Sequence, residues 1–598
     1  MTEREGARPG ARPGDRFLPS RRRTKLPRTL GAGALFSACY GNVGSSIYYG
    51  LGVTAAFALG LTPLALILAG LIFVTTALNY AEGTAALPHA GGSSSFARRA
   101  FNQPAGFLVG WIQLLNYTAT VAISSYTAIS YLAVLGNYVS VFRLLREPQW
   151  RIGAAVVLVA LLIAVNIVGI QESSVVNLTL ALLDLVTQLA LVLLGVFLLL
   201  NLQVVLHNIH WGVAPTWGSF LASISIAMVT YTGIETISNM SEEARNPGRT
   251  VPRATYAVIV AVLFVSAFLP TIGMSVFPVH LDPVTHQYTT DLATKWQNDP
   301  VAGIVAQFRP QALAFWAGVW VAILAFTILV IATNAGLIGL SRLSYSLAVN
   351  DLFPKPFARL HPKFKTPYLA LIVFGTIGAL LLLPDRIVQM AAVYSLAATF
   401  AFCTAHLSVM RLRYVEPAMY RPYRMPLNIK FGRASIPVLS VVGALAIGAV
   451  FTQLLTQNIA ASSVIFVLWL AAGVVAFVAY RRFRHQPIWE PLEQPPPPEL
   501  RRKLTAGAPV RPSEYVRLRR REHAAPAAPA PAQEPAVVTL PRRVRIAIAG
   551  GLGLASVAVI VIDLSPLDPT GPGLGWSPGF VVVFLVAAGI LIRSRVER

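Results

Sequence analysis

The chain contains few charged residues. Asp, Glu, Lys and Arg make up only 12% of its 598 residues, whereas a typical soluble domain contains about 25%. Hydrophobic residues make up 55%. This balance excludes a disordered chain, a coiled coil and nearly every soluble enzyme, and it predicts a polytopic membrane protein.

Cysteine and the common metal and nucleotide motifs are also scarce. The two cysteines, Cys39 and Cys403, both lie in apolar runs and are too few for a disulfide framework or a metal cluster. The patterns HExxH, CxxC and GxxxxGK[ST] do not occur in the sequence. We therefore predict no bound metal, no cofactor, no ATP-driven motor and no enzyme activity.

Basic residues outnumber acidic ones, 48 to 25, for a net charge of +23. In a soluble protein this excess would indicate nucleic acid binding, but here the basic residues lie between apolar runs, where they determine membrane orientation. If the loops alternate from an inside N-terminus, 42 basic residues lie inside and 6 outside. This bias predicts both termini in the cytoplasm, a plasma-membrane location and no nucleic acid partner. The basic tails are expected to be solvated, and contact with anionic membrane lipid is the alternative. The N-terminal residues lack the apolar stretch of a cleavable signal peptide.

A membrane-spanning helix needs about 20 mostly apolar residues, because the hydrocarbon core is about 30 Å thick. Backbone groups in lipid must be hydrogen-bonded internally, which favours helices, and the apolar runs are too long for barrel strands. The sequence therefore predicts an all-α fold with twelve core helices, at 31–58, 62–82, 105–135, 152–170, 177–201, 217–239, 254–276, 312–340, 368–384, 388–410, 436–456 and 461–480. Two more spans follow at 546–562 and 577–592.

Composition divides the chain into four parts. A basic N-terminal tail (1–30) precedes the twelve-helix core (31–482). Residues 483–541, which include four consecutive prolines at Pro495–Pro498, cannot bury a core and predict a disordered cytoplasmic linker. The last part, 542–598, is expected to be a two-helix membrane appendage.

Two of the predicted spans contain clusters of helix-breaking residues, Tyr40–Ser46 in the first and Thr230–Glu235 in the sixth. Glycine costs about 1 kcal/mol relative to alanine in a helix, and hydroxyl and amide side chains compete for backbone hydrogen bonds. Each cluster therefore predicts a break in mid-membrane, with close packing of small residues as the alternative. Because the clusters begin two consecutive five-helix blocks, about 31–201 and 217–410, the sequence favours a transporter site between inverted repeats.

These clusters resemble motifs of the amino acid–polyamine–organocation (APC) superfamily of amino acid permeases. Val43–Ile47 is similar to the family's Ile-Gly-Ser-Gly-Ile motif, and Tyr231–Glu235 to its Phe-x-Gly-Phe-Glu motif. The loops after the sixth and eighth helices carry further similarity, in Glu242–Pro247, Val251–Arg253, Ser341, Arg342, Ala348, Asn350, Asp351 and Pro354. The resemblance implies a LeuT-type 5+5 inverted repeat, in which helices 1, 2, 6 and 7 rock against helices 3, 4, 8 and 9 while helices 5 and 10 gate.

The resemblance also implies a substrate site at the two breaks. The N-terminal end of a half-helix attracts a carboxylate, and freed carbonyl groups attract an ammonium group. The residues that match the family's positions for the carboxylate are Gly44, Ser45 and Ser46, and those for the ammonium group are Asn42, Val229 and Thr232. Gly233, Tyr117 and Tyr231 complete the predicted site, and the ring of Tyr231 either gates it or packs. Ser46 departs from the motif, whose second glycine it replaces, and its Cβ restricts the approach of other backbone.

Asp184 lies in the middle of the fifth predicted helix, where proton-coupled relatives can carry Lys. A carboxylate at bilayer depth is costly and is by default a functional hypothesis. We predict that Asp184 couples transport to H⁺; binding of Na⁺, contact with a cationic substrate, and a structural hydrogen bond to Gln188 are the alternatives. Glu235, at the end of the sixth-helix break, is expected either to hold the broken backbone or to contact substrate.

The inner ends of the helices carry acidic residues that are expected to pair with basic loop residues as a cytoplasmic gate. The acidic group comprises Glu82, Glu242 and Glu243, and the basic group Arg98, Arg245 and Arg342. Taken together, the sequence predicts a secondary active transporter that moves an amino acid by H⁺-coupled symport. A polyamine, amine or cation transporter of the same fold, and a non-transporting membrane sensor or scaffold, are the alternatives.

Overall fold

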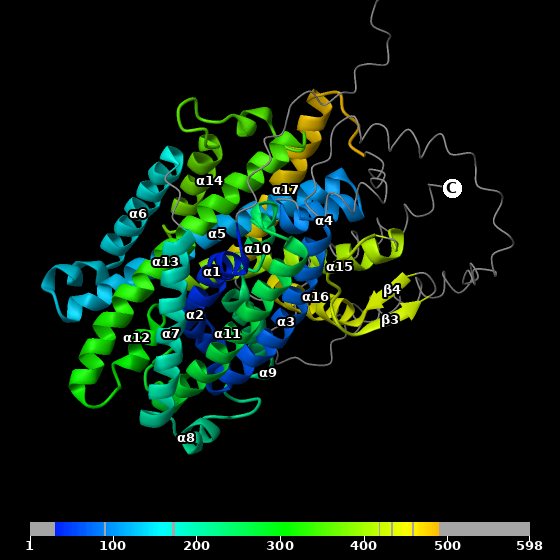
Figure 1. Cartoon of the computed structure of the whole chain (residues 1–598). Coiled ribbons are helices and arrows are strands. Elements are labelled where there is room, and N and C mark those ends of the chain that lie inside the picture. Colours follow the sequence, from blue (N-terminus) through cyan, green and yellow to red (C-terminus); the bar gives the residue numbers. More distant parts are fainter. Residues whose placement is uncertain are drawn as a thin grey trace, which may run out of the picture.

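The computed structural model of the protein describes residues 30–88, 91–169, 174–417, 419–431, 434–456 and 460–489 (Figure 1). The predicted N-terminal tail, except Leu30, lies outside the described residues. So do the predicted linker beyond residue 489 and the predicted two-helix appendage at 542–598. The described ranges hold nearly all of the predicted twelve-helix core.

Every predicted core span is helical, and the first and sixth consist of several helical pieces. The first half of the core contains α1 (Ala32–Val43), the 3-10 turn η2 (Gly44–Ser46), α2 (Ile47–Ala58), α3 (Thr62–Ala86), α5 (Gln103–Val134), α6 (Pro148–Val168) and α7 (Ser174–Leu198). The sixth span contains α9 (Trp217–Ala227), the 3-10 turn η6 (Met228–Tyr231) and α10 (Glu235–Asn239). The remaining spans are α11 (Pro247–Val276), α13 (Gln311–Val349), α14 (Tyr368–Leu380), α15 (Ile387–Val415), α16 (Val438–Thr456) and α17 (Ala460–Phe483).

Ten helical stretches within the described ranges are long and apolar enough to cross a membrane. One of them, Ala32–Ala86, has 55 residues, and at about 1.5 Å per residue it is more than twice as long as a bilayer core is thick. Leu59, with a φ of 46°, interrupts this stretch between α2 and α3. α14 is apolar but has only 13 residues. The helices therefore define a multi-pass membrane protein, while the count of twelve plus two and the 5+5 repeat stay predictions.

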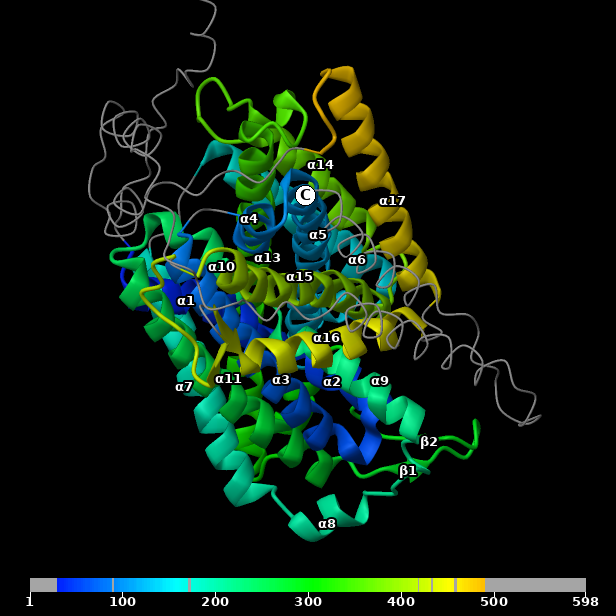
Figure 2. The ribbon, with the colours of Figure 1, turned by 90° about the vertical axis from the view of Figure 1, so that its right-hand side faces the viewer.

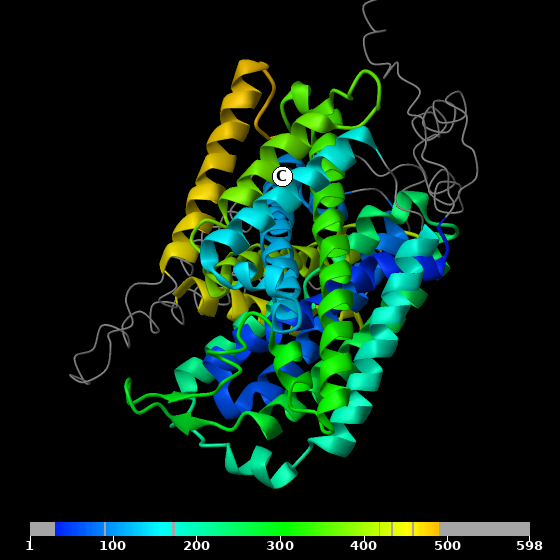
Figure 3. The same ribbon diagram turned by 90° about the vertical axis from the view of Figure 1, so that its left-hand side faces the viewer.

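Helix α5 lies at the centre of the bundle, where it packs along α13 and α15. The α5–α13 contact is close, because a Cβ at Gly339 would lie 2.6 Å from the ring of Tyr117. At the periphery, α6 lies at the edge of Figure 1 and α17 at the edge of Figure 3. Both helices expose apolar side chains, such as Val157, Leu161 and Val475, as expected for surfaces in contact with lipid.

The short elements separate to the two ends of the molecule. Figure 2 shows α8 (Leu202–His207) and the hairpin of β1 (His280–Leu281) and β2 (Tyr288–Thr289) at one end, and α4 (Gly92–Ala100) toward the other. A second antiparallel hairpin, β3 (Asn428–Phe431) with β4 (Ala434–Pro437), connects α15 to α16. The other short elements are α12 (Pro300–Val305) and the 3-10 turns η3 (Leu59–Leu61), η4 (Leu135–Asn137), η5 (Ser140–Arg146), η7 (Ser241–Glu243) and η8 (Lys355–Ala358).

Candidate functional site

The sixth span is broken at Thr232 and Gly233. Thr232 is extended, with φ −79° and ψ 153°, and Gly233 has a φ of 113°, which residues with a Cβ rarely adopt. The Thr232 hydroxyl donates to the Val229 carbonyl at 2.8 Å, and so satisfies an acceptor at the end of η6. On the other side of the break, Glu235 Oε2 accepts the Gly233 N–H at 3.1 Å. This break matches the one predicted from the sequence.

The first span tightens instead of opening, contrary to the prediction. Gly44–Ser46 form a single 3-10 turn. The backbone dihedral angles of Val43, Gly44, Ser46 and Ile47 all have right-handed helical values, so the chain does not leave the helix here. The hydroxyls of Ser45 and Ser46 donate to the Asn42 carbonyl at 3.2 and 3.1 Å, a back-bonding that satisfies the hydroxyls within the helix but tends to bend it. Ser46, which replaces the second glycine of the motif, favours the helix through its Cβ, because glycine costs about 0.5–1 kcal/mol relative to alanine in a helix.

Gly44 is needed because a larger residue would clash with a neighbouring side chain, and not because its backbone conformation requires glycine. Its φ of −66° is open to any residue, but a Cβ at this position would lie 2.6 Å from the ring of Tyr40. The glycine therefore makes room for an aromatic ring one turn earlier in the same helix.

The two interrupted spans contact each other directly. A Cβ at Gly233 would lie 2.8 Å from Asn42 Cγ, and Asn42 Nδ2 donates to Thr236 Oγ1 at 3.1 Å. A Cβ at Gly50 of α2 would lie even closer to the Thr230 hydroxyl of η6. The structure thus brings seven of the predicted site residues into one buried region, namely Asn42, Gly44, Ser45, Ser46, Val229, Thr232 and Gly233.

Asp184 of α7 ties together the two halves of the first span. Its Oδ2 accepts the Tyr40 hydroxyl at 3.2 Å and its Oδ1 accepts the Tyr48 hydroxyl at 2.7 Å. Tyr40 precedes the 3-10 turn and Tyr48 follows it, so one carboxyl group bridges the turn. Gln188 Nε2 also donates to Asp184 Oδ2, at 2.8 Å, so the predicted contact between these two residues is present. Asp184 is fully buried.

Glu235 supports the broken backbone and is itself positioned by the third span. Besides the Gly233 N–H, it accepts a hydrogen bond from Asn116 Nδ2 of α5 at 3.2 Å, through Oε1. Glu235 is almost fully buried. Of the two roles considered for it, the geometry favours the structural one.

Tyr117 and Tyr231 lie at the edges of this region. The Tyr231 hydroxyl donates to the Leu66 carbonyl of α3 at 2.6 Å, and its ring stacks on Phe73 with the ring centroids 5.3 Å apart. Of the two roles considered for Tyr231, packing is the one that this arrangement favours. The Tyr117 hydroxyl accepts a hydrogen bond from Asn239 at the inner end of α10, so this residue faces the inner half of the sixth span.

Several buried polar atoms close to the break lack a hydrogen-bond partner among the described residues. They are the hydroxyls of Thr230 and Ser395 and the Oδ1 atom of Asn116. Ser395 lies on α15, which contacts η6. Because a buried polar atom without a partner costs free energy, these atoms are suited to receive a polar ligand beside the broken backbone.

Tyr131 of α5 links the second half of the first span to the short helix α12. Its hydroxyl donates to the Tyr48 carbonyl at 3.0 Å and accepts the Val301 N–H of α12 at 3.2 Å. Asp299 precedes α12 and is only partly exposed. Burial raises the pKa of Asp299 to about 7, against the opposing positive charges of Arg146 and Arg151.

Two ion pairs bear on the predicted cytoplasmic gate, one that was predicted and one that sequence reasoning missed. Glu243 pairs with Arg342 at 2.9 Å, as expected for the cytoplasmic gate. Glu82, however, pairs with Arg413 of α15 and not with the predicted partners. The three remaining gate residues are Arg98 in α4, Glu242 in η7 and Arg245, two residues after the end of η7.

Sequence reasoning also missed the tyrosines around Asp184. Tyr40 and Tyr48 flank the first-span motif on either side, and a polar hydroxyl within an apolar helix was a signal that could have marked them. Tyr131 and Arg413 were missed because their contacts join elements far apart in the chain.

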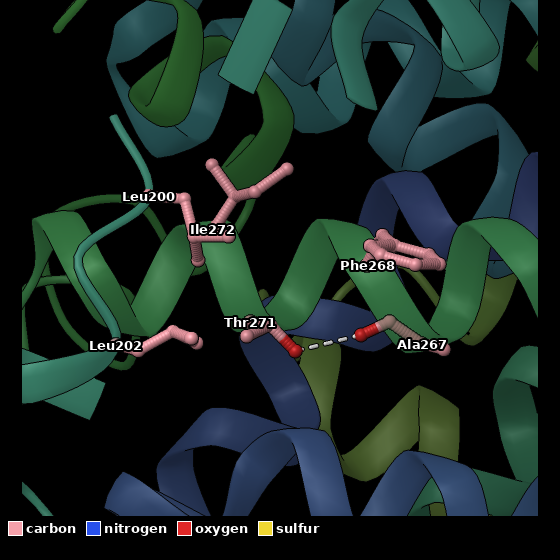
Figure 4. Close-up of a pocket in the computed structure, with 6 residues that line it drawn as sticks. All are labelled: Leu200, Leu202, Ala267, Phe268, Thr271 and Ile272. Carbon is pink, nitrogen blue, oxygen red and sulfur yellow. Dashed lines mark hydrogen bonds between the residues drawn. The ribbon is translucent and has the colours of Figure 1, made fainter. Parts of the chain in front are cut away.

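An apolar hollow elsewhere in the structure lies between α11 and the chain that joins α7 to α8 (Figure 4). Its lining residues are Leu200, Leu202, Ala267, Phe268, Thr271 and Ile272. The Thr271 hydroxyl donates to the Ala267 carbonyl at 2.7 Å, so the hollow offers no free hydroxyl to a polar solute. It is therefore not a candidate for the site of an amino acid.

Apolar helices packed around a broken, polar span define an integral membrane protein with a buried polar centre. The sequence profile of the family described as amino acid permease matches residues 33–478. The chain belongs to this amino acid permease family, which is a family of transporters and not of enzymes.

Curated relatives of the chain are permeases of both prokaryotic and eukaryotic origin. The low-affinity putrescine importer PlaP of Escherichia coli (strain K12) is 26% identical over 461 residues, which cover 73% of this chain and 90% of PlaP. The branched-chain amino acid permease BcaP of Bacillus subtilis (strain 168) is 26% identical over 479 residues, covering 76% of this chain and 94% of BcaP. A crystal structure of a mutant manganese transporter of Eremococcus coleocola aligns with a TM-score of 0.45 at 12% identity, over 76% of this chain and 94% of that one.

Proposed function

We propose that the protein is a secondary active transporter that imports an amino acid by alternating access, with the substrate held between the η2 turn and the Thr232–Gly233 break. The observation that carries this proposal is the break itself, which faces Asn42 and lies beside buried hydroxyls that lack partners. The α-carboxylate would lie at the amides and hydroxyls of Gly44, Ser45 and Ser46. The ammonium group would take the carbonyls of Asn42, Val229 and Thr232.

The contacts of this closed arrangement suggest how substrate would enter it. The Asn42 and Val229 carbonyls accept hydroxyls from the chain's own Ser45, Ser46 and Thr232. A bound ammonium group would compete for these acceptors, which would release the hydroxyls to the substrate carboxylate. The site would thus exchange internal hydrogen bonds for substrate bonds.

We propose that Asp184 couples this transport to H⁺. Its carboxyl group accepts bonds from Tyr40, Tyr48 and Gln188, and it forms no ion pair within the described ranges. A proton on this group would remove an acceptor and loosen the connection between the two halves of the first span. Protonation would thereby favour one access state over the other.

Uptake into proteoliposomes tests both parts of the proposal. We expect a panel of the common amino acids and of putrescine to identify a substrate whose accumulation follows an imposed proton gradient. Asp184→Asn should abolish that accumulation but keep exchange of substrate across the membrane, whereas Asp351→Asn, at an inner loop, should leave both intact. Uptake that survives collapse of the proton gradient but disappears without Na⁺ would contradict proton coupling.

A second candidate substrate class is an amine without a carboxylate. Two observations favour it: PlaP is named a putrescine importer, and the centre of this chain buries two carboxyl groups, those of Asp184 and Glu235. The same panel separates the two classes, because an amine transporter accumulates putrescine and is not inhibited by neutral amino acids.

We further propose that the protein lies in the plasma membrane with both termini in the cytoplasm, and that the segment after residue 489 is not needed for transport. Removal of residues 490–598 should then leave uptake unchanged. Loss of uptake in a truncated protein that still inserts and folds would support the sensor or scaffold alternative, in which this segment is the functional part.

A further inference from the structure

A row of polar residues runs along the inner half of α3 and joins this helix to α15 and α16. The row has helical spacing, and each of its members is almost fully buried. We name it, together with its partners, the inner seam; its three pairs are Thr76 with His406, Asn79 with Ser440, and Glu82 with Arg413. The first pair is 3.2 Å apart, the second 2.5 Å, and Arg413 Nε lies 2.7 Å from Glu82 Oε1.

The Glu82 end of the seam also holds the β3–β4 hairpin. Glu82 Oε2 accepts the Met425 N–H at 2.9 Å, and Arg413 donates to Ser435 at 3.1 Å and to Asn428. Arg421 lies 3.8 Å from the same carboxylate. Burial lowers the pKa of Arg421 to about 10, with Glu82 opposing the shift, so this guanidinium is still charged at neutral pH. One carboxylate thus connects α3, the end of α15 and the hairpin.

The inner face therefore has two kinds of ion pair. The Glu82 and Arg413 side chains are only 1% and 2% exposed, so separating them would leave two buried charges without compensation. The Glu243 and Arg342 side chains are 19% and 33% exposed, and water can solvate both once they separate. The second pair can open repeatedly at low cost, whereas the first cannot.

The two last helices of the core attach to different parts of the bundle. α16 joins α3 through Ser440 of the seam. α17 instead joins α5, because the indoles of Trp111 and Trp469 stack with centroids 4.7 Å apart and each donates to the other's carbonyl, at 2.7 and 3.0 Å.

We propose that the inner seam stays closed throughout the transport cycle, so that α3, the inner half of α15, the β3–β4 hairpin and the start of α16 move as one body. The inner face then opens elsewhere, at Glu243 and Arg342. This inference rests on the proposed alternating access, and it differs from the motion that the family resemblance implies, in which helix 10 gates separately from helix 2.

Paired cysteines in a background without Cys39 and Cys403 test the proposal. Asn79→Cys with Ser440→Cys places one thiol on each side of the seam, and Glu243→Cys with Arg342→Cys places them across the contact that opens. After closure by oxidation or by a short bis-methanethiosulfonate, we expect the seam pair to retain uptake and the gate pair to lose it until reductant is added. Loss of uptake in the cross-linked seam pair, with recovery on reduction, would overturn the proposal.

Thiol accessibility gives a readout that does not depend on transport. In inside-out vesicles, a single cysteine at position 342 should react with a membrane-impermeant maleimide, and a single cysteine at position 79 should be protected with or without substrates and at every pH tested. Labelling at position 79 in any folded condition contradicts a permanently closed seam. If the parent protein takes up no substrate while a cysteine at position 79 stays protected from the maleimide, the proposed transport function is contradicted and the proposal of a closed seam is not.

Discussion

The first and sixth spans carry similar clusters of glycine and polar residues, yet they fold differently. The sixth leaves the helix at Thr232 and Gly233, whereas the first only tightens into a 3-10 turn at Gly44–Ser46. In the sixth span the glycine supplies a backbone conformation, with a φ of 113°. In the first it supplies space for the Tyr40 ring. The same residue type thus has two different physical roles at corresponding positions.

The side chains around each glycine explain the difference. Ser45 and Ser46 return their hydroxyls to a carbonyl of their own helix, and Asp184 bridges the turn through Tyr40 and Tyr48. Around Gly233, by contrast, Glu235 accepts the freed N–H, which stabilises the open backbone. One helix is held closed from both sides, and the other is held open.

The largest effect is expected from Gly233→Ala, which should close or distort the sixth-span break. The new Cβ would lie 2.8 Å from Asn42 Cγ at a φ of 113°, and such backbone strain costs on the order of 1–3 kcal/mol. We expect loss of substrate binding and a lower Tm, measured by binding to purified protein and by thermal unfolding. Gly448→Ala is the matched control, because nothing lies near that Cβ and the variant should keep both properties. Full binding by Gly233→Ala would contradict a site at the break.

The next effect should come from Tyr48→Phe, which removes the shorter of the two tyrosine bonds to Asp184. Loss of a hydrogen bond typically costs about 1 kcal/mol, and the second half of the first span should become less firmly held. Hydrogen exchange of the amides in α2 reports this as faster exchange. Tyr40→Phe, which removes the 3.2 Å bond, should speed the exchange of these amides less. If the amides of both variants exchange at the same rate as those of the parent protein, Asp184 does not hold the turn.

Ser46→Gly would make the first span more like the sixth, since it restores the second glycine of the motif. Removal of the Cβ should cost about 0.5–1 kcal/mol of helix stability, and exchange at residues 43–47 should become faster. Ser46→Ala keeps the Cβ and removes only the hydroxyl, which separates the two contributions. If neither variant changes exchange, neither the Cβ of Ser46 nor its bond to Asn42 is what keeps the helix closed.

The smallest effect is expected from Asp299→Asn, at the start of α12. The pKa of Asp299 in the folded protein is about 7, above its value in an unfolded chain, so ionisation of this carboxyl disfavours the fold as the pH rises from about 4 to 7. The asparagine variant should match the parent at pH 4 and exceed its stability above pH 7. Because the side chain is partly exposed, we expect a gain below about 1 kcal/mol. A thermal-unfolding series from pH 4 to 8 measures it, and a constant difference across that range would contradict the assignment.

Local composition is enough to locate the spanning helices and the break in the sixth one. Both depend on local composition: runs of about 20 apolar residues form helices in lipid because the backbone must bond to itself, and Gly233 followed by Glu235 supplies both the unusual φ and the cap. The pairing of Asp184 with Gln188 was predictable for the same reason, since the two residues lie one turn apart on one helix. Only the tertiary structure decided the rest.

The family's motif predicted a break in the first span as well, but the bonds of Asp184 to Tyr40 and Tyr48 hold that helix together, and they join residues more than 130 positions apart. Glu82 could have paired with any of several nearby arginines; it pairs with Arg413, 331 positions away, because α3 packs on α15. Such partners follow from the way helices pack, and one helix's own composition does not contain that information.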